Sequence, residues 1–397
     1  MKEYKLSEIL TIKNGRDYKN LKNGLYPVYG SGGLMCTVDN YLYERPSVLL
    51  PRKGTLSNIQ FADSPFWTVD TLYYTEIDTH LADPYYLYYY LKQLDLTRLD
   101  SGTGVPSMTF DSYYNIKVCL PNIDKQRAVG QLLSVVDDKI QLNKRINDNL
   151  EAMAKQLYDY WFVQFDFPNE EGKPYKSNGG VMVWNEKLKR EIPQGWSDCV
   201  LGDYIGRITN GLNPRKNFVL GSGNNYYVTI RSLVGTTIDW NNCDRCDDEA
   251  LSKINSRSQL QIGDIIFSAI GTIGRTYYIL EEPTNWNISE TSFTLRAKEN
   301  IPNDFFYGML RSNEIRIKAD KAAMGSTLRC LVMDSLCSLQ YIEIPSYMMK
   351  LFATKVSPLY RQIHRNNKEI AELTKQRDEL LPLLMNGQAS VNYHLSL

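Results

Sequence analysis

Two long stretches of the chain repeat apolar residues every seven positions, and each follows a stretch of mixed strand and helix pattern. In the first, about residues 125–165, the two series are Val129, Val136, Asn143, Leu150, Leu157 and Leu132, Lys139, Ile146, Met153, Tyr160. In the second, about residues 347–386, they are Val356, Ile363, Ile370, Arg377, Leu384 and Leu359, Asn366, Leu373, Leu380. Such a repeat predicts two coiled-coil helices.

The stretches before these helices combine strand and helix signals. Residues 48–50 form a short apolar run, and residues 72–75 alternate in the manner of a half-buried strand. From Pro84 to Leu99 the apolar positions recur at helical spacing, and a proline is favoured at the first turn of a helix. Residues 305–317 predict an equivalent helix later in the chain. The fold class is therefore α+β.

The chain repeats its turn residues in the same order, which indicates a duplication. Residues 13–15 are echoed by 209–211, and the offset grows from 196 to about 223 residues along the repeat. The other echoes pair residues 52–56 with 269–273, 70–71 with 290–291, Gly102 with Gly325, and Pro121 with Pro345. A period this long predicts a duplicated domain plus helix rather than a solenoid unit. The extra residues of the second copy lie mostly between Gly211 and Thr291.

Each helix has one asparagine in its apolar series, a device that can fix register and orientation. If the helices run antiparallel, Asn143 is expected opposite Asn366, with Ile146 beside Ile363. Because these asparagines are related by the duplication offset, the pairing also predicts a pseudo-two-fold axis near them. A helix of about 40 residues is about 60 Å long, enough to hold two domains apart. The alternative is two separate helices, each packed on its own domain.

Composition limits the class of protein without identifying it. The 397 residues are 43% hydrophobic and 23% charged with a formal net charge of zero, as in an ordinary soluble globular protein. A balanced charge gives no simple argument for nucleic acid, although a local basic face remains compatible with it. Seven scattered cysteines predict a reduced compartment. With no signal-peptide pattern and no apolar run of about 18 residues, we expect a cytoplasmic protein that does not bind membranes.

Motifs that could carry chemistry have simpler structural explanations. Residues 83–86, Asp-Pro-Tyr-Tyr, approach the motif of adenine methyltransferases but lack its second proline, and helix initiation is favoured. Residues 137–139 and 171–173 have the carboxylate-x-lysine spacing of nucleases, yet lie on the predicted coiled coil and in a polar linker. Cys243 and Cys246 have zinc-ligand spacing without a second ligand pair. No catalytic, cofactor-binding or metal-binding residue is therefore predicted.

Several short motifs, in their order along the chain, resemble the specificity subunits of type I restriction-modification enzymes. They are Ile192-Pro193-x-Gly195-Trp196 followed by Leu201-Gly202, the turns at Gly54-Thr55 and 271–274, and the helix start Ile123-x-x-Gln126-Arg127-Ala128-Val129. The resemblance implies two target-recognition domains joined by two long helices, which form an antiparallel coiled coil with pseudo-two-fold symmetry. It also implies a non-catalytic reader of an asymmetric bipartite sequence in double-stranded DNA.

The resemblance further implies the protein's partners and domain limits. Two methyltransferase subunits, and restriction/translocase subunits for cleavage, would bind this chain and carry the S-adenosylmethionine, Mg and ATP chemistry. The expected parts are residues 1–121 (first target-recognition domain), 122–168 (first helix), 169–191 (linker), 192–345 (second target-recognition domain), 346–388 (second helix) and 389–397 (tail). The aromatic residues expected to dock a partner are Tyr158, Trp161, Phe162 and Phe165.

DNA contacts are expected in loops that flank the glycine turns shared by the two copies. Base edges are read by Arg, Asn and Gln, whereas Lys, Ser and Thr commonly hold phosphates. The candidates are Lys13, Arg16, Arg52, Lys53, Thr55, Arg98, Thr103 and Ser107 in the first domain, and Arg215, Lys216, Arg231, Ser268, Thr272, Arg275, Ser326 and Arg329 in the second. The alternatives are a bivalent scaffold that binds only proteins and an independent methyltransferase.

Overall fold

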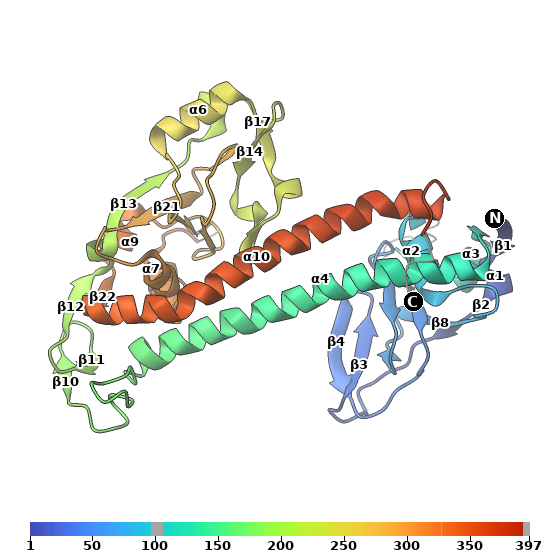
Figure 1. Cartoon of the computed structure of the whole chain (residues 1–397), viewed down its shortest axis with the longest axis horizontal. Coiled ribbons are helices and arrows are strands. Elements are labelled where there is room, and N and C mark those ends of the chain that lie inside the picture. The colour runs from blue at the N-terminus through green and yellow to red at the C-terminus, as the bar shows by residue number, and fades with distance from the viewer. Residues whose placement is uncertain (97–105, 327, 392–397) are drawn as a thin grey trace. The chain divides into compact units, whose positions relative to one another are not determined.

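The computed structural model describes residues 1–96, 106–326 and 328–391 of the chain. It divides into two compact units, Met1–Leu142 with Ile370–Leu397, and Asn143–Glu369. Helix α4 (Ile123–Tyr158) and helix α10 (Ser346–Met385) each contribute a segment to both units (Figure 1). The units therefore cut across the predicted boundaries, because each helix end packs with the domain beside it.

The described part of the first unit holds three small sheets. A four-stranded antiparallel sheet has the order β2-β8-β5-β6, a three-stranded sheet the order β4-β3-β7, and β1 pairs with β9. The strands are β1 (Lys2–Lys5), β2 (Leu10–Asn14), β3 (Tyr26–Gly30), β4 (Gly33–Val38), β5 (Ser47–Pro51), β6 (Gln60–Ala62), β7 (Trp67–Thr68), β8 (Leu72–Ile77) and β9 (Lys117–Leu120). All five residues of β5 are buried, which makes it the central strand of the core.

Short helices cover these sheets. They are α1 (Leu6–Ile9), α2 (Pro84–Lys92) and α3 (Phe110–Tyr114). The carboxylate of Asp83 accepts a hydrogen bond from the backbone N–H of Tyr86 and Pro84 stands in the first turn, so residues 83–86 begin α2 as predicted. The helix ends at Lys92, earlier than the predicted Leu99, which lies outside the described residues.

The second unit repeats the same three sheets. The order β13-β21-β18-β19 matches the first four-stranded sheet, β17-β14-β20 matches the three-stranded sheet, and β12 pairs with β22. The strands are β12 (Ser197–Val200), β13 (Ile205–Asn210), β14 (Asn225–Val228), β17 (Asp244–Cys246), β18 (Ile265–Ser268), β19 (Thr276–Tyr278), β20 (Trp286–Ile288), β21 (Ser292–Ala297) and β22 (Gln340–Glu343). The predicted duplication is confirmed at the level of sheet topology.

Two glycines show why the repeated turn residues matter. A Cβ on Gly15 would lie 2.1 Å from the carbonyl oxygen of Val69, and a Cβ on Gly211 would lie 1.8 Å from that of Ile288. Both distances are far below van der Waals contact, so only glycine fits where this turn crosses the last strand of the three-stranded sheet. The echo between residues 13–15 and 209–211 therefore reflects the same packing in both copies.

The second unit carries additional elements. They are the hairpins β10 (Met182–Asn185) with β11 (Arg190–Pro193) and β15 (Leu233–Val234) with β16 (Thr237–Ile238), the helices α5 (Pro214–Asn217), α6 (Asp248–Arg257) and α8 (Asn313–Ala322), and the 3-10 helices η4 (Ile230–Ser232) and η5 (Trp240–Asn242). The 3-10 helix η3 (Leu201–Tyr204) and the helices α7 (Asn303–Leu310) and α9 (Met333–Cys337) stand at the places of α1, α2 and α3. Most of the predicted insertion is accounted for by the β15–β16 hairpin and α6. The single helix predicted over 305–317 is two helices, because Ser312 caps a new one by accepting from the backbone N–H of Ile315.

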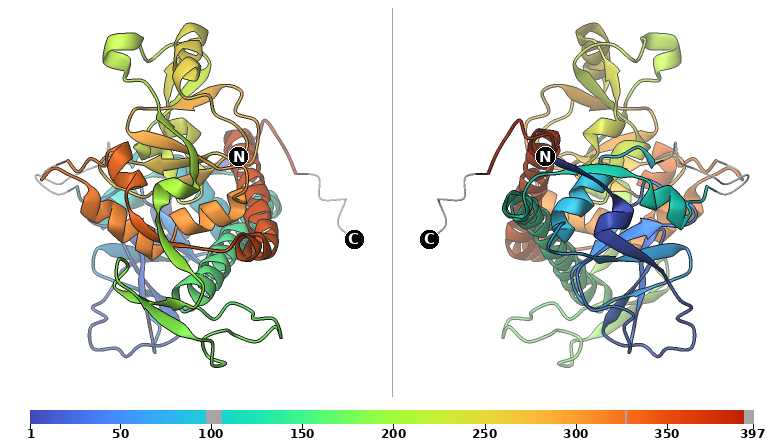
Figure 2. Two further views of the ribbon diagram at one scale, coloured as in Figure 1. Left: turned by 90° about the vertical axis from the view of Figure 1, so that its left-hand side faces the viewer. Right: turned by 90° about the vertical axis from the view of Figure 1, so that its right-hand side faces the viewer.

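The two long helices contact each other in antiparallel order within each unit. In the first unit the Arg377 guanidinium Nη1 lies 2.6 Å from a carboxylate oxygen of Asp137. In the second unit the Asn143 side chain donates to Glu369 at 2.8 Å, and Asn366 donates to Asn147 at 2.8 Å. The ribbons of α4 and α10 run side by side along this stretch (Figures 1 and 2). The pairing of the two helices that the seven-residue repeat predicted is confirmed within each unit, in the antiparallel order that the family resemblance implied. The predicted direct partner of Asn366 was wrong by one helical turn, because Asn147 rather than Asn143 bonds to it. The pseudo-two-fold axis stays a prediction.

One of the two apolar series in α4 was assigned to the wrong face. The series Leu132, Ile146, Met153 and Tyr160 is exposed, at 39%, 36%, 53% and 37%. The buried positions lie one residue later, at Leu133, Ile140, Asn147, Ala154 and Trp161. Both series repeat every seven residues and contain apolar side chains, and they differ only in phase by one residue. Which series is buried depends on the parts of each unit that also cover the helix. In α10 the predicted Val356, Ile363 and Leu384 are buried.

Candidate nucleic-acid interface

In the first unit, backbone hydrogen bonds join the loop after β5 to the segment before α3. The N–H of Gly54 donates to the carbonyl of Pro106 at 2.9 Å, and the N–H of Met108 donates to that of Arg52 at 2.9 Å. The N–H groups of Arg52 and Lys53 also donate to the carbonyl of Thr71, at 3.0 and 3.3 Å. Three segments far apart in sequence are therefore held as one surface.

A groove of about 330 Å³ opens on this surface. It is lined by Asn14, Arg52, Lys53, Tyr73, Ser107, Met108, Thr109 and Phe110. The Arg52 guanidinium lies 5.9 Å from the centre of the Tyr73 ring, and that ring meets Phe110 edge-on at 4.7 Å. Burial raises the pKa of the Tyr73 phenol, so it stays neutral. Cations and hydroxyls around an aromatic floor suit the phosphates and base edges of nucleic acid.

The second unit builds the same arrangement from the corresponding residues. The N–H of Gly271 donates to the carbonyl of Arg329 at 2.9 Å, and the N–H of Leu331 donates to that of Ala269 at 2.8 Å. The N–H of Ala269 donates to the carbonyl of Thr291 at 2.9 Å, as Arg52 does to Thr71. Both turns need a glycine, since φ is +92° at Gly54 and +76° at Gly271. The echo between residues 52–56 and 269–273 therefore marks equivalent loops.

The equivalent positions carry different side chains. Where the first unit has Arg52 and Lys53, the second has Ala269 and Ile270, and where the first has Pro106 the second has Arg329. The Arg329 guanidinium lies 3.3 Å from the Asp320 carboxylate and donates to backbone carbonyls of Asp320 and Ala323. One scaffold thus places cations at different points in its two copies.

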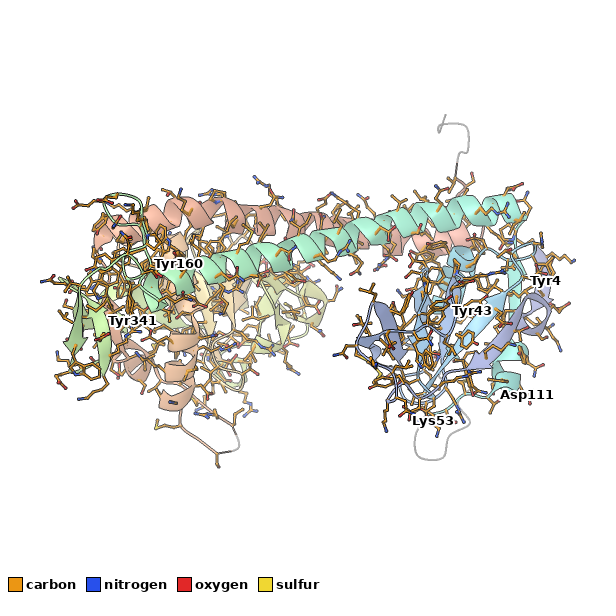
Figure 3. All side chains as sticks on the ribbon, turned by 90° about the horizontal axis from the view of Figure 1, so that it is seen from below. Tyr4, Tyr43, Lys53, Asp111, Tyr160 and Tyr341 are labelled. Atoms are coloured by element: carbon orange, nitrogen blue, oxygen red, sulfur yellow. The ribbon has the colours of Figure 1, made fainter. Side chains whose placement is uncertain are left out.

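The remaining candidates of the first unit that the structure describes do not line this groove. Lys13 lies on β2 next to Asn14, with its Nζ 3.4 Å from the Glu76 carboxylate. Arg16 has an exposed side chain and a fixed backbone, since its N–H donates to Thr68 at 2.8 Å. Thr55 is exposed, and Lys53 lies on the side of this domain away from α4 (Figure 3). Arg98 and Thr103 lie outside the described residues.

Six candidates of the second unit have exposed side chains, whereas Arg329 is partly buried and Ser268 is buried. The exposed ones are Arg215 and Lys216 on α5, Arg231 in η4, Thr272, Arg275 and Ser326. The Arg275 guanidinium donates to the carbonyls of Ile230 and Leu233, at 3.3 and 3.1 Å. Ser268 is fully buried, and its hydroxyl donates to the carbonyl of Thr272 at 2.6 Å. The structure contradicts the prediction for Ser268, which stabilises the turn instead of contacting DNA.

The predicted partner-docking aromatics are also corrected. Tyr158, Trp161, Phe162 and Phe165 are each 5% exposed or less and belong to the main core of the second unit. Phe162 packs against Phe305 of α7 and Phe352 of α10, with ring centres 5.5 and 5.2 Å away. The error arose because two helices alone could not bury so many rings, whereas the second domain supplies the missing cover.

The groove includes residues that sequence reasoning missed. Asn14, Tyr73, Thr109 and Phe110 line it beside the predicted cations. Asn14 could have been chosen, because it stands in the echoed tripeptide 13–15 and asparagine reads adenine well. Tyr73 and Phe110 stand in apolar sequence patterns that are also typical of core residues. Only the folded structure shows that these two line the groove.

The motifs considered for catalysis have structural roles. Asp137 accepts a hydrogen bond from the Tyr89 hydroxyl at 2.6 Å, and the Lys173 Nζ lies 2.8 Å from the Glu171 carboxylate. Cys243 donates to the carbonyl of Asp239 at 3.4 Å, and burial raises the pKa of its thiol. Within the described ranges, no group of three His, Cys, Asp or Glu side chains could hold a metal ion. None of the helices in that part of the chain combines the length and apolar character needed to cross a bilayer.

A duplicated α+β domain with matched loops and unlike side chains defines the architectural class, two similar domains that share two long helices. Comparison with known proteins shows which family this architecture resembles. Residues 1–152 match the model of the type I restriction modification DNA specificity domain. The MjaIX specificity subunit of Methanocaldococcus jannaschii is 25% identical over 361 residues, which cover 88% of this chain and 79% of that protein.

Two further similarities agree with this match. The HindI specificity subunit of Haemophilus influenzae is 23% identical over 348 residues, 75% of this chain and 74% of the relative. The crystal structure of the type I restriction-modification S subunit from M. genitalium covers 96% of this chain and 95% of its own, with a TM-score of 0.65 at 17% identity, a likeness of fold. Residues 1–152 thus carry the DNA specificity domain of type I restriction-modification systems, and the chain as a whole is similar to the specificity subunits of these enzymes.

Proposed function

We propose that the chain reads an asymmetric bipartite sequence in double-stranded DNA, with one half-site for each domain. The proposal rests on one observation, that backbone bonds build the same loop pair twice while the side chains differ at the positions of Arg52 and Lys53. An arginine reads guanine through two hydrogen bonds and a lysine holds phosphate, whereas alanine and isoleucine make only apolar contacts. The two loop pairs would therefore recognise different bases, and the unread spacer would depend on the long helices that join the domains.

In this proposal the chain itself has no catalytic role. It binds two methyltransferase subunits, which use S-adenosylmethionine to methylate adenine, and restriction/translocase subunits, which use ATP and Mg. Since the four aromatics first assigned to docking are buried, an exposed apolar face of α4 is the better docking surface. In the first unit it comprises Leu132, Val135 and Leu142, of which Val135 is 59% exposed. Their spacing of three and seven residues places them on one side of the helix.

The experiment that tests the reading function is a map of methylated adenines. The chain is expressed with its methyltransferase subunit, and methylation is compared between wild type and the double variant Arg52→Ala with Lys53→Ile, which copies the second domain. We expect a bipartite motif for wild type, and for the variant a change confined to one half of it. A matched control is Lys22→Ala, an exposed lysine that does not line the groove, which should leave both halves unchanged.

The outcomes distinguish a subunit that recognises a DNA sequence from a scaffold that binds only protein partners. Absence of any bipartite motif for wild type would refute the proposal. Assembly with partners that is insensitive to salt, together with no measurable DNA affinity, would instead favour a protein scaffold, because DNA binding through phosphates weakens steeply as salt rises.

A further inference from the structure

A cleft of about 660 Å³ lies within the second unit, apart from the groove-forming loops. Its walls come from α4, the β15–β16 hairpin, the turn before β19, α7, α8 and α10. The charged residues of the lining are Glu151, Lys155, Arg275, Arg311 and Arg316. Four cations and one carboxylate give the wall a formal charge of +3, so the cleft favours an anion.

The single carboxylate of this wall is already paired. The Arg311 guanidinium Nη2 lies 2.6 Å from Glu151 and Nη1 donates to the Tyr307 hydroxyl at 2.9 Å. Lys155 has its own partner on α4, with its Nζ 2.7 Å from Asp159, a residue that does not line the cleft. Counting Asp159 as well, the local charge remains +2. The ligand that this charge recognises carries at least one negative charge.

Two further cations of the wall have no ion-pair partner among the described residues, and one of them is held by backbone carbonyls. Arg275 donates to the carbonyls of Ile230 and Leu233, which fix its guanidinium without neutralising it. Arg316 is exposed, and its side chain lies against Gly274. A Cβ added to Gly274 would lie 3.1 Å from the Cγ of Arg316. The N-terminus of α8, capped by Ser312, also lines the cleft and adds the positive end of a helix dipole. The site is therefore positioned before any ligand arrives.

The cleft depends on an element found in only one copy of the duplication. Leu233, Val234 and Gly235 of the β15–β16 hairpin form one wall. In the first unit the corresponding strands β3 and β4 pair directly at Gly30 and Gly33, so that no such hairpin stands among its described residues. Any ligand of the cleft is specific to the second domain.

Arg275 links the cleft to the candidate DNA interface. Arg275 lies four residues after Gly271 in the chain. The N–H of Gly271 donates to the carbonyl of Arg329, and this bond joins the two loops of the second unit that correspond to the groove of the first. We infer that the cleft holds a backbone phosphate of duplex DNA beside the second half-site, an inference that rests on the proposed reading function. The first domain makes no equivalent contact through a hairpin of this kind. DNA affinity would then depend on the second domain more strongly than the similarity of the two scaffolds suggests.

The test measures how DNA affinity changes with salt. The complete assembly with its methyltransferase subunits binds a labelled duplex that carries the mapped motif, and Kd is measured for wild type and for Arg316→Gln. Each phosphate contact contributes about 0.9 to the slope of log K against log salt. Arg316→Gln should lower the magnitude of the slope by about 0.9. The ratio of the variant's Kd to the wild-type Kd should therefore shrink about 3.5-fold between about 50 and about 200 mM salt.

Two controls keep the test specific. Lys321→Gln removes another exposed cation of α8 that does not line the cleft, and should leave the slope unchanged. Lys155→Gln removes a second cleft cation and should act like Arg316→Gln, which protects the test against misfolding of one variant. Duplexes with a neutral methylphosphonate at single positions should bind more weakly to wild type at one phosphate near the second half-site, and Arg316→Gln should be insensitive to that substitution.

The possible results are distinct. A slope unchanged by both cleft variants overturns the phosphate site while the methylation map still supports DNA reading. Loss of methyltransferase binding by the cleft variants, with the DNA slope unchanged, also overturns it and assigns the cleft to a protein contact. If wild type lacks sequence-specific DNA affinity altogether, the reading function itself fails.

Discussion

Replacing Phe162 by alanine decides whether the aromatic cluster where α4 continues into the π-helical turn η2 (Asp159–Val163) is a core or a docking surface. Phe162 is 1% exposed, and its ring centre lies 5.0 Å from Tyr158, 5.2 Å from Phe352 and 5.5 Å from Phe305. Truncating a buried phenylalanine costs about 3–5 kcal/mol, including the cavity that remains. A domain is stable by only about 5–15 kcal/mol, so the second unit should lose a large part of its stability.

The assay follows the second unit alone. Hydrogen exchange of the amides in α7 reports its unfolding, and their protection should fall by the equivalent of about 3–5 kcal/mol in Phe162→Ala. The matched control is Tyr160→Ala, an aromatic residue in the same turn whose side chain is 37% exposed. Exposed substitutions usually change stability by about 0.5 kcal/mol or less. Affinity for the methyltransferase subunit is measured on both variants at a temperature where each is folded.

One result would refute this reasoning. If Phe162→Ala kept wild-type protection in α7 but lost the methyltransferase subunit, the ring would belong to an interface and the core assignment would be wrong. Equal destabilisation by Phe162→Ala and Tyr160→Ala would also contradict it, because the burial of the two residues differs so strongly.

Three further predictions test separate parts of the structure. Arg296→Met should destabilise the second unit by about 3–5 kcal/mol in urea unfolding, because it leaves the fully buried Asp264 carboxylate without its partner at 2.7 Å, and adding Asp264→Asn should recover part of this. Tyr86→Phe should be neutral or stabilising, because the buried hydroxyl has no hydrogen-bond partner in the described structure. Burial raises the pKa of Tyr86 from 10.0 to about 12, so this tyrosine ionises at lower pH in the unfolded chain than in the folded one. Its ionisation therefore lowers the stability of the wild type as pH rises from 10 towards 12. The Tyr86→Phe variant should lack this contribution to the loss of stability. Gly15→Ala and Gly211→Ala should each cost at least about 1–3 kcal/mol in their own unit, measured by hydrogen exchange, because the new Cβ meets backbone oxygen.

Most of the scaffold could be predicted from the sequence because its signals are local. Glycine at 54 and 271 is required by a positive φ, and Asp83 with Pro84 begins a helix through contacts within one turn. The phase of α4 could not be predicted in the same way. Leu132 and Leu133 have the same side chain, and only the domain packed on that helix decides that Leu133 is buried and Leu132 is exposed.

The candidate site was predictable in its location and not in its details. Arg52, Lys53 and Ser107 were expected on one surface because they flank repeated turns, and they line one groove. Ser268 flanks the same kind of turn, yet its hydroxyl is consumed inside the turn. A serine beside a turn carries no pattern that separates these two uses, since Ser107 and Ser268 both lie three residues from a glycine.

The way in which the loops are held explains how one scaffold can serve two half-sites. The bonds from Gly54 to Pro106 and from Gly271 to Arg329 join backbone groups, which every residue supplies whatever its side chain. Exchanging Arg52 for an alanine, as at position 269, removes one side-chain bond, from the guanidinium to the carbonyl of Asp70 at 3.3 Å, and leaves the backbone bonds that position the loop intact. The glycines cannot vary in this way, because their constraints are steric. Recognition can thus change at the side chains of a loop whose shape is fixed by its backbone, while the same glycine turns remain in both copies.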